Sequence, residues 1–457
     1  MKAEELIYKN ENIAVKCPMD LIKAMDFCEG YKLFLNRAKT ERETVIEIIS
    51  QAEKEGYEEF SREKKYKAGS KLFFNSRGKD AILVTIGHED LSRGVRFNIA
   101  HIDCPRLDLK PNPLYEQDET ALFKTHYYGG IRKYQWTAVP LAIHGTVVLR
   151  SGEKKAISIG EADADPKFFI SDLLPHLSKK QDERTLKDGI KGEELNVIVG
   201  STPYKDTDEK EPYRLMVLSI LNDMFGMTEK DFLRAEIEVV PAAKASDIGF
   251  DRALVGAYGQ DDRVCAYTAM MAAFEASDPR YTTVTVFTDK EEIGSYGNTG
   301  MDSLYLDHFL SDLCESQGAV KRDLYRNSFC VSSDVGAAYD PTFSDVFEKN
   351  NVPYLGHGPI ITKYTGARGK GGASDASAET MARVISILDD NGVCWQTGEL
   401  GKVDEGGGGT IAHYIASHDV DTVDVGVPVL AMHAPFELTS KLDVYHTYLA
   451  FKAVLLS

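Results

Sequence analysis

Strand-like and helix-like runs alternate along the second half of the chain, and this alternation limits the possible fold more than any other feature. After a strand-like run at 235–240, helical runs at 263–277, 375–392 and 440–456 are separated by short strand-like runs such as "TTVTVFT", "SFCVSSD" and "VPVLAMHA". Alternation of this kind is typical of an α/β domain whose mostly parallel sheet is sandwiched by helices. We therefore predict the α/β class for the larger part of the chain.

A β-rich module interrupts this pattern. Before it come a helical run at 41–60 and three strand-like runs, "KLFFN", "AILVTIG" and "VRFNIAHID". The module itself contains "TAVPLAIHGTVVLR", "KAISIG" and "LNVIVG", which are short strand-like runs separated by proline and glycine turns. We predict an α/β domain in two parts, 1–104 and 237–457, with an inserted β-rich domain at 105–236.

Composition excludes several classes of protein. The 457 residues include 71 acidic and 53 basic ones, which gives a net charge of −18 without a lysine- or arginine-rich block. Nucleic acid and anionic membranes are therefore not expected partners. The N-terminus lacks the apolar core of a signal peptide, and no apolar run approaches the roughly 20 residues of a membrane span. Seven scattered cysteines without a CxxC pair indicate reduced thiols, and we expect a cytoplasmic protein.

Imidazole and carboxylate groups follow the strand-like runs, where ligand sites of open α/β sheets collect. The residues concerned are His101 and Asp103; Asp289, Glu291 and Glu292; Asp334; and His433. Asp261 and Asp262 begin the helical run that follows them in "QDDR". Singly, each has a plainer interpretation as a core histidine, a cap or a surface residue. Together, two histidines and four to six carboxylates make the ligand set of a two-metal hydrolytic centre that suits zinc, manganese or cobalt.

Spacing within two of these motifs indicates a division of roles. In "HID", residues two apart on a strand point the same way, so Asp103 can accept the second ring N–H of His101 and fix its tautomer. In "DKEE", adjacent residues of an extended segment point in opposite directions. One of Glu291 and Glu292 would then bind metal while the other acts as general base toward a metal-bound water.

Six motifs in this order resemble the M18 family of metalloaminopeptidases, the relatives of aspartyl aminopeptidase. They are "NIAHIDCPRLDLKPNP", "GQDDRVCAYTA", "TDKEEIGS", "SSDVGAAYDP", "GGASDASAETMARV" and "VPVLAMHA", and they cover almost the whole chain. M42 and M28 peptidases share pieces such as "AHID", whereas the ordered set with a β insertion is specific. The resemblance implies a zinc-peptidase-like α/β fold with an inserted dimerisation domain.

The resemblance also implies the roles of the site residues. Asp261 would bridge two divalent metal ions, expected to be zinc with manganese or cobalt as alternatives; His101 and Asp334 would hold one, and Glu292 and His433 the other. Glu291 would be the general base that activates the bridging water. Asp103 would orient His101.

Beyond the metals, the resemblance concerns assembly and substrate. His176, in "SDLLPHLSKK", would reach a neighbouring subunit's active site and stabilise the tetrahedral intermediate. Self-association into dimers and a tetrahedral dodecamer is implied, and the substrates would be short peptides with a free N-terminus.

Two departures from the acid-preferring members concern the first residue of the substrate. This chain has "VGAAYDPTF" where those members carry histidines, and His357 stands where a lysine is expected. Neutral or basic N-terminal residues are therefore alternatives to Asp or Glu. Two other functions remain open: an M42-like peptidase or deacylase acting on another amide, and an oligomeric scaffold with a vestigial site.

Overall fold

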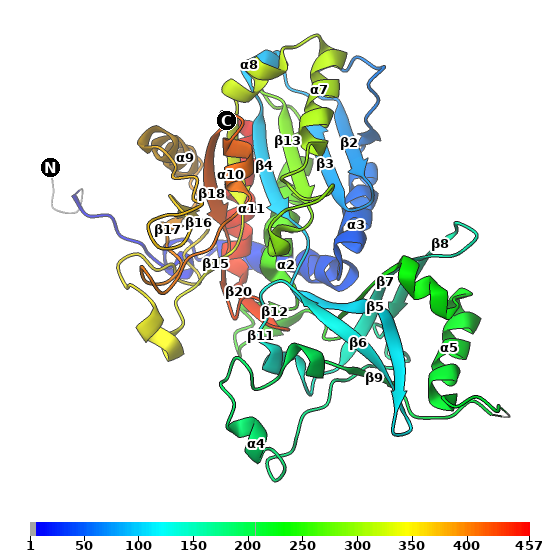
Figure 1. Cartoon of the computed structure of the whole chain (residues 1–457). Helices are drawn as coiled ribbons and strands as arrows, with labels where there is room; N and C mark the ends of the chain where they lie inside the picture. Colours follow the sequence, from blue (N-terminus) through cyan, green and yellow to red (C-terminus); the bar gives the residue numbers. More distant parts are fainter. Residues whose placement is uncertain (1–5, 206) are drawn as a thin grey trace. The chain divides into compact units, whose positions relative to one another are not determined.

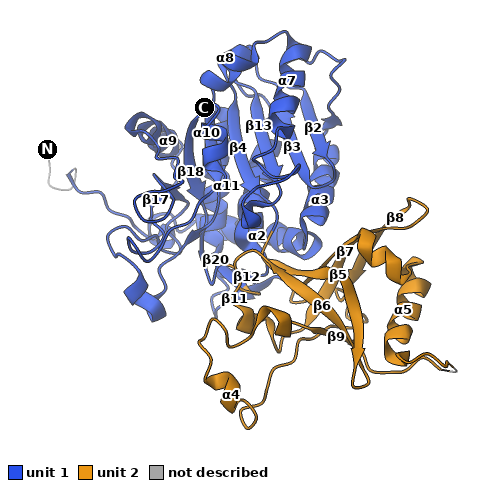
Figure 2. Ribbon diagram, in the orientation of Figure 1, with its two compact units in different colours: residues 1–103, 245–432, 437–457 blue, residues 104–244, 433–436 orange. Residues whose placement is uncertain are grey.

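A computed structural model of the chain describes residues 6–205 and 207–457, which fall into two compact units. Unit 1 contains residues 1–103, 245–432 and 437–457, and unit 2 contains residues 104–244 and 433–436 (Figure 2). The boundaries that the sequence analysis gives for the inserted domain, at 104/105 and 236/237, remain predictions. Each unit has its own sheets, and each is described separately below.

The larger sheet of unit 1 has nine strands in the described residues. In spatial order they are β1 (Glu58–Glu59), β2 (Lys71–Ser76), β3 (Asp80–Thr85), β13 (Thr283–Thr288), β4 (Arg96–His101), β14 (Phe329–Ser333), β18 (Asp421–Gly426), β16 (Ile360–Thr362) and β17 (Gln396–Thr397). The four central strands β13, β4, β14 and β18 are mutually parallel, while β3 and β16 run antiparallel to their central neighbours (Figure 1). The predicted mostly parallel sheet is confirmed.

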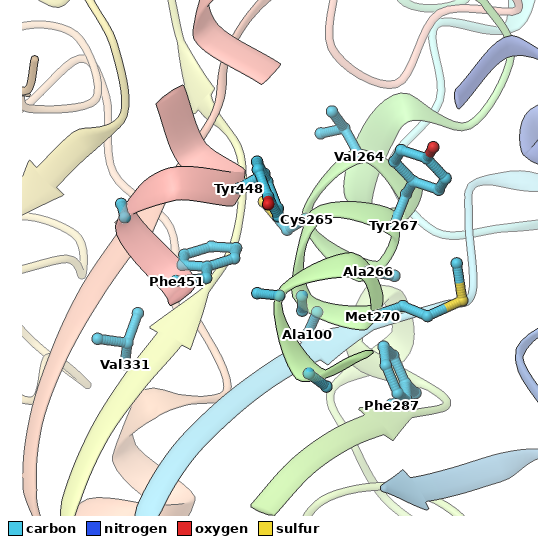
Figure 3. Packing of buried hydrophobic residues seen from close by; sticks show 14 of the residues in the cluster. Ala100, Val264, Cys265, Ala266, Tyr267, Met270, Phe287, Val331, Tyr448 and Phe451 are labelled. Atoms are coloured by element: carbon cyan, nitrogen blue, oxygen red, sulfur yellow. The ribbon is translucent and has the colours of Figure 1, made fainter. Parts of the chain in front are cut away.

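Helices cover both faces of this sheet. The helices of unit 1 in the described residues are α1 (Ile13–Lys16), α2 (Asp20–Arg37), α3 (Glu41–Lys54), α6 (Gln260–Glu275), α7 (Tyr305–Gln317), α8 (Lys321–Arg326), α9 (Ala378–Asp390), α10 (Ala412–Ala416) and α11 (Lys441–Leu456). Side chains alternate along each strand, so Phe97 and Ile99 pack with α7 and α8, whereas Ala100 packs with α6 and α11. Figure 3 shows the hydrophobic cluster that contains Ala100, where Phe287 and Val331 lie with Met270 and Phe451.

Helix α2 is a finding beyond the sequence analysis, which placed no helix before residue 41. Its buried residues include Ala24, Cys28, Tyr31 and Leu35, a spacing of three and four that lies on one helical face. Charged residues between them mask this stripe when the sequence is read as a whole. The helix packs on α11 and α6 and completes that side of the core.

A smaller sheet in unit 1 changes the interpretation of one predicted strand. Its strands in order are β11 (Ser246–Ile248), β12 (Leu254–Ala257), β20 (Glu437–Ser440), β19 (Pro428–Leu430) and β15 (Gly336–Ala337). The run "VPVLAMHA" contributes β19 to this small sheet. The strand that lies beside β14 in the main sheet is instead β18, which comes just before this run in the sequence. His433 therefore does not follow a strand of the main sheet.

Unit 2 is built on a six-stranded antiparallel sheet. Its strands in order are β8 (Lys154–Ile159), β7 (Leu141–Val148), β10 (Ala235–Pro241), β5 (Arg106–Gln117), β6 (Thr120–Tyr128) and β9 (Val197–Gly200). Its α-helices are the single-turn α4 (Lys179–Asp182) and the longer α5 (Pro212–Phe225). The β-rich insertion is confirmed, and its role in dimerisation stays a prediction. None of the helices described here is both long and apolar enough to cross a membrane.

Candidate metal centre

Three parallel strands bring the predicted site residues of unit 1 to one edge of the main sheet. In the β13–β4 pair, Thr288 lies opposite His101, and in the β14–β4 pair, Ser333 lies opposite Ala100. Because these strands are parallel and in register, the segments that follow them leave the sheet at the same edge. Those segments carry the carboxylates of Asp103, Glu291, Glu292 and Asp334.

His101 is the buried centre of this edge. Its Nδ1 lies 3.0 Å from the carbonyl oxygen of Asp103, which can only accept, so Nδ1 is the protonated nitrogen. Its Nε2 faces Asp261 Oδ1 at 3.1 Å and Asp334 Oδ1 at 3.8 Å. Burial opposes the charged imidazolium, but the contacts with Asp103, Asp261 and Asp334 outweigh it and raise the pKa of His101 well above its usual value. Nε2 is thus held among carboxylates.

Asp103 contacts more than the one histidine that the sequence analysis assigned to it. Its Oδ1 lies 3.3 Å from His101 Nδ1, and it accepts the backbone N–H of Glu291 at 3.0 Å. Its other oxygen accepts the backbone N–H of Glu292 at 3.2 Å. This single buried carboxylate therefore ties the imidazole to the segment that carries both glutamates.

Glu291 and Glu292 lie in a short 3₁₀ turn, Glu291–Ile293, after strand β13. Burial raises the pKa of Glu291 to about 8; His101 lowers it, and the negative charges of Asp334, Asp103 and Asp261 raise it further. Without a bound cation, the carboxyl group of Glu291 therefore keeps its proton near neutral pH. A divalent ion would remove that penalty, because it favours the ionised carboxylates.

Asp261 and Asp262 occupy the first turn of α6, with backbone angles that are not helical. The N-cap residue is Gly259, so neither aspartate has the capping role that remained open from the sequence. Asp261 donates its N–H to Glu437 Oε2 at 3.1 Å. Asp262 is fully buried, and burial raises the pKa of its carboxyl well above the usual value.

Two sets of potential metal ligands lie wholly within unit 1. One is His101, Glu291 and Glu292, and the other is His101, Asp262 and Asp334; within each set the donor atoms lie within 4.8 Å of one another. Sequence reasoning did not choose Asp262 as a ligand. The "QDDR" motif offers two adjacent carboxylates. The non-helical backbone angles that decide where each carboxylate lies cannot be predicted from residue types.

Two predicted site residues belong to unit 2. His433 has a positive φ of 66°, and its Nδ1 lies 2.8 Å from the carbonyl oxygen of Gly130. His176 is exposed in the loop before α4, among Leu173, Leu174 and Leu177, which are also exposed. The roles assigned to these two histidines remain proposals.

Comparison with known proteins identifies the family. A model of the family described as aminopeptidase I zinc metalloprotease (M18) matches residues 34–455. A probable M18 family aminopeptidase 1 of Clostridium acetobutylicum is 47% identical over 435 residues, covering 93% of this chain and 94% of that protein. The chain belongs to the M18 family. It is an aminopeptidase, a metallohydrolase that acts on N-terminal peptide bonds.

Solved structures show the same fold. The crystal structure of an M18 aminopeptidase from Thermotoga maritima is 42% identical and matches with a TM-score of 0.93, covering 98% of this chain and 99% of that one. The mApe1 dodecamer of S. cerevisiae is 19% identical, with a TM-score of 0.76 and coverage of 95% and 96%, and it shows the fold alone.

The residues of this M18 aminopeptidase fit the zinc that the family description names. The two ligand sets consist of carboxylate oxygens and imidazole nitrogen, which are donors that zinc accepts. Nε2 is the nitrogen of His101 that remains available to a metal, because Nδ1 faces Asp103. The mutual repulsion of the carboxylates, visible in the raised pKa of Glu291, is what a bound cation would relieve.

Asp289, the first acidic residue of the "TDKEEIGS" motif, is not part of either ligand set. Asp289 is buried and accepts the hydroxyl of Thr299 at 2.7 Å. Lys290 Nζ lies 3.2 Å and Lys79 Nζ 3.8 Å from the same carboxylate oxygen. In this M18 enzyme Asp289 therefore holds the loop that follows β13. Two lysines offset part of its charge, but burial and the charges of Glu41 and Asp103 still raise its pKa to about 6.

We expect Asp103→Asn to lower kcat/KM for a dipeptide about 10–100-fold, the usual effect of losing a carboxylate that supports a metal ligand. The amide keeps the size of Asp103, but its NH₂ group cannot accept from Glu291, Glu292 or His101. Steady-state kinetics at saturating zinc measure the change. Asp278→Asn, at an exposed aspartate, is the control and should match wild type. Equal rates for Asp103→Asn would contradict a positioning role.

Proposed function

We propose that the chain is a co-catalytic, two-metal aminopeptidase that removes the N-terminal residue from short unblocked peptides. The observation that supports this most is the convergence of His101, Asp261, Asp262, Glu291, Glu292 and Asp334 at one sheet edge. In this proposal His101 and Asp334 would hold one zinc ion, Glu292 and His433 would hold the other, and Asp261 would be a ligand that both ions share. The structure adds Asp262 as a further candidate ligand beside His101 and Asp334.

When bound, the zinc ions would polarise the scissile carbonyl and lower the pKa of the attacking water toward about 7. The chain's own residues would do the rest. Glu291 accepts the proton of that water and later gives it to the leaving amine. Asp103 holds the imidazole of His101 and the backbone of both glutamates in place.

Metal counting tests the ligand assignment. Elemental analysis of the purified, zinc-loaded chain should give two zinc ions per chain for wild type and one for His433→Ala. His413→Ala, which changes a histidine outside the site, should keep both ions. One zinc ion in the wild type, or two in His433→Ala, would contradict the assignment.

Self-association is part of the proposal. Unit 2 would join chains into dimers and then a tetrahedral dodecamer, an assembly of the size named for the yeast relative. The exposure of His176 beside three exposed leucines supports a role at a neighbouring chain. The seven free cysteines fit the reducing cytoplasm where we place the enzyme.

Mixing two inactive variants tests whether His176 acts on a neighbouring chain. Assemblies reconstituted from His176→Ala and Glu291→Gln chains should regain activity, because some sites would combine an intact Glu291 with an intact His176 from the neighbour. Each variant reassembled alone is the control. No recovery in mixed assemblies that native mass spectrometry proves to be mixed would assign His176 to its own chain.

A further inference from the structure

A fully exposed phenylalanine lies at the tip of a hairpin in unit 1. Phe250 connects β11 and β12, and its exposed fraction of 112% is the highest of the large apolar residues in the described part of the chain. A single exposed apolar residue is ordinary, but an aromatic ring entirely in solvent is the residue type that anchors interfaces. The metal centre makes no use of this ring.

Local contacts hold the turn that carries Phe250. Gly249 has a φ of +88°, and a Cβ there would lie 2.9 Å from Asp251 Oδ1. That oxygen accepts the N–H of Ala253, and Arg252 Nε donates to Asp247 at 2.8 Å. A turn that is already held by such contacts loses little backbone entropy when it binds.

An apolar cavity lies in unit 2, between helix α5 and the antiparallel sheet. Its volume is about 370 Å³, and its lining includes Val217, Ile220, Leu221 and Met224 of α5 with Phe123 and Ile237 of the sheet. Ile220 and Met224 are 49% and 54% exposed, so the cavity opens to solvent beside the helix. Val217 is the one buried residue of α5, although apolar residues occur along the whole helix. Such a helix is normally covered.

We propose that Phe250 of one chain inserts into this cavity of a second copy. The inference rests on the self-association proposed above and names one contact of it. A dry apolar cavity of about 150 Å³ already accepts benzene, so 370 Å³ is sufficient for a phenyl ring. Charge is complementary as well, because Asp251 follows Phe250 and Lys167 lines the cavity.

The symmetry of the contact follows from where its two halves lie. Phe250 is in unit 1 and the cavity is in unit 2, so every copy offers one ring and one cavity. A two-fold dimer would contain the contact twice, and a closed ring would contain it once per interface. In either arrangement every Phe250 side chain is inserted into a cavity, and every cavity holds a phenyl ring.

Light scattering after size exclusion, over a dilution series of zinc-loaded enzyme, tests the contribution of the Phe250 side chain to assembly. Phe250→Ala should raise the dissociation constant of the assembly about 30-fold or more, the loss expected of an interface anchor. Phe343→Ala, at another exposed phenylalanine, should assemble as wild type. An unchanged constant for Phe250→Ala would overturn the inference while leaving the proposed self-association intact.

The cavity is tested from the other side by Met224→Trp, which fills its mouth at a half-exposed position. This variant should weaken assembly as Phe250→Ala does, and the double variant should be no weaker than the worse single variant. Leu186→Trp, at an exposed residue outside the cavity, should assemble normally. Normal assembly of a natively folded Met224→Trp would overturn the cavity as the receptor. A wild-type chain that stays monomeric would overturn self-association itself.

Discussion

Glu291→Gln is expected to lower kcat for an unblocked dipeptide about 10²–10⁴-fold, the range that a general acid–base group supplies. The amide keeps the size and the buried surroundings of Glu291 but cannot take a proton from the attacking water. Its neighbour Glu292, on the same 3₁₀ turn, is the proposed zinc ligand. We therefore expect the zinc content of Glu291→Gln to equal that of wild type.

Glu292→Gln is the matched comparison, since it alters the adjacent residue in the same chemical way. It should lose zinc as well as activity, whereas Glu291→Gln loses activity alone. Elemental analysis and steady-state rates on the same samples separate the two outcomes. A Glu291→Gln enzyme with full rate would contradict the proposed mechanism, and zinc loss in that variant would make Glu291 a ligand, as one of the two ligand sets permits.

Removal of zinc is expected to abolish activity and to lower thermal stability, and added zinc should restore both. The ligands lie on several strand ends of unit 1, so zinc binds the folded chain and stabilises it by mass action. At 100 times Kd this effect is about 2.7 kcal/mol. Scanning calorimetry of the chelator-treated and the reloaded enzyme measures the shift. Equal melting temperatures would contradict zinc binding at this edge.

Zinc affinity should also fall as the pH is lowered from 9 to 6. In the metal-free chain the pKa of Glu291 is raised to about 8 and that of His101 is raised well above its usual value. Protons therefore occupy this cluster below about pH 8 and compete with zinc, which requires neutral imidazole and ionised carboxylates. Competition with a coloured chelator at each pH gives the affinity. An affinity that is constant over this range would contradict the coupling.

The fold class, and the meeting of several candidate site residues at one sheet edge, could be predicted because they depend on short patterns. Alternating strands and helices predict the parallel sheet, and polar residues after β4, β13 and β14 then meet at one edge. Asp289, Glu291 and Glu292 looked alike in sequence, yet Asp289 contacts Lys79 and Lys290 and lies outside the ligand sets, whereas both glutamates belong to one of them. Residue types do not show which charge has a compensating partner.

Other features depend on contacts between distant residues and could not be predicted. The run "VPVLAMHA" looks like a central strand, but β19 joins the small sheet because β18 already occupies the place beside β14. Asp262 is a candidate ligand because the first turn of α6, whose backbone is not helical there, places its carboxylate close to His101 and Asp334. The two backbone N–H groups that donate to Asp103 lie 188 and 189 residues away along the chain.

The most direct test of the account is the release of free amino acids from unblocked dipeptides and from their N-acetylated counterparts by the zinc-loaded enzyme. We predict zinc-dependent cleavage of the unblocked peptides alone, since an aminopeptidase acts at a free N-terminus. A panel of acidic, neutral and basic first residues ranks the substrate preference in the same experiment. Equal cleavage of the acetylated peptides would contradict the account and indicate a deacylase or an endopeptidase at the same centre.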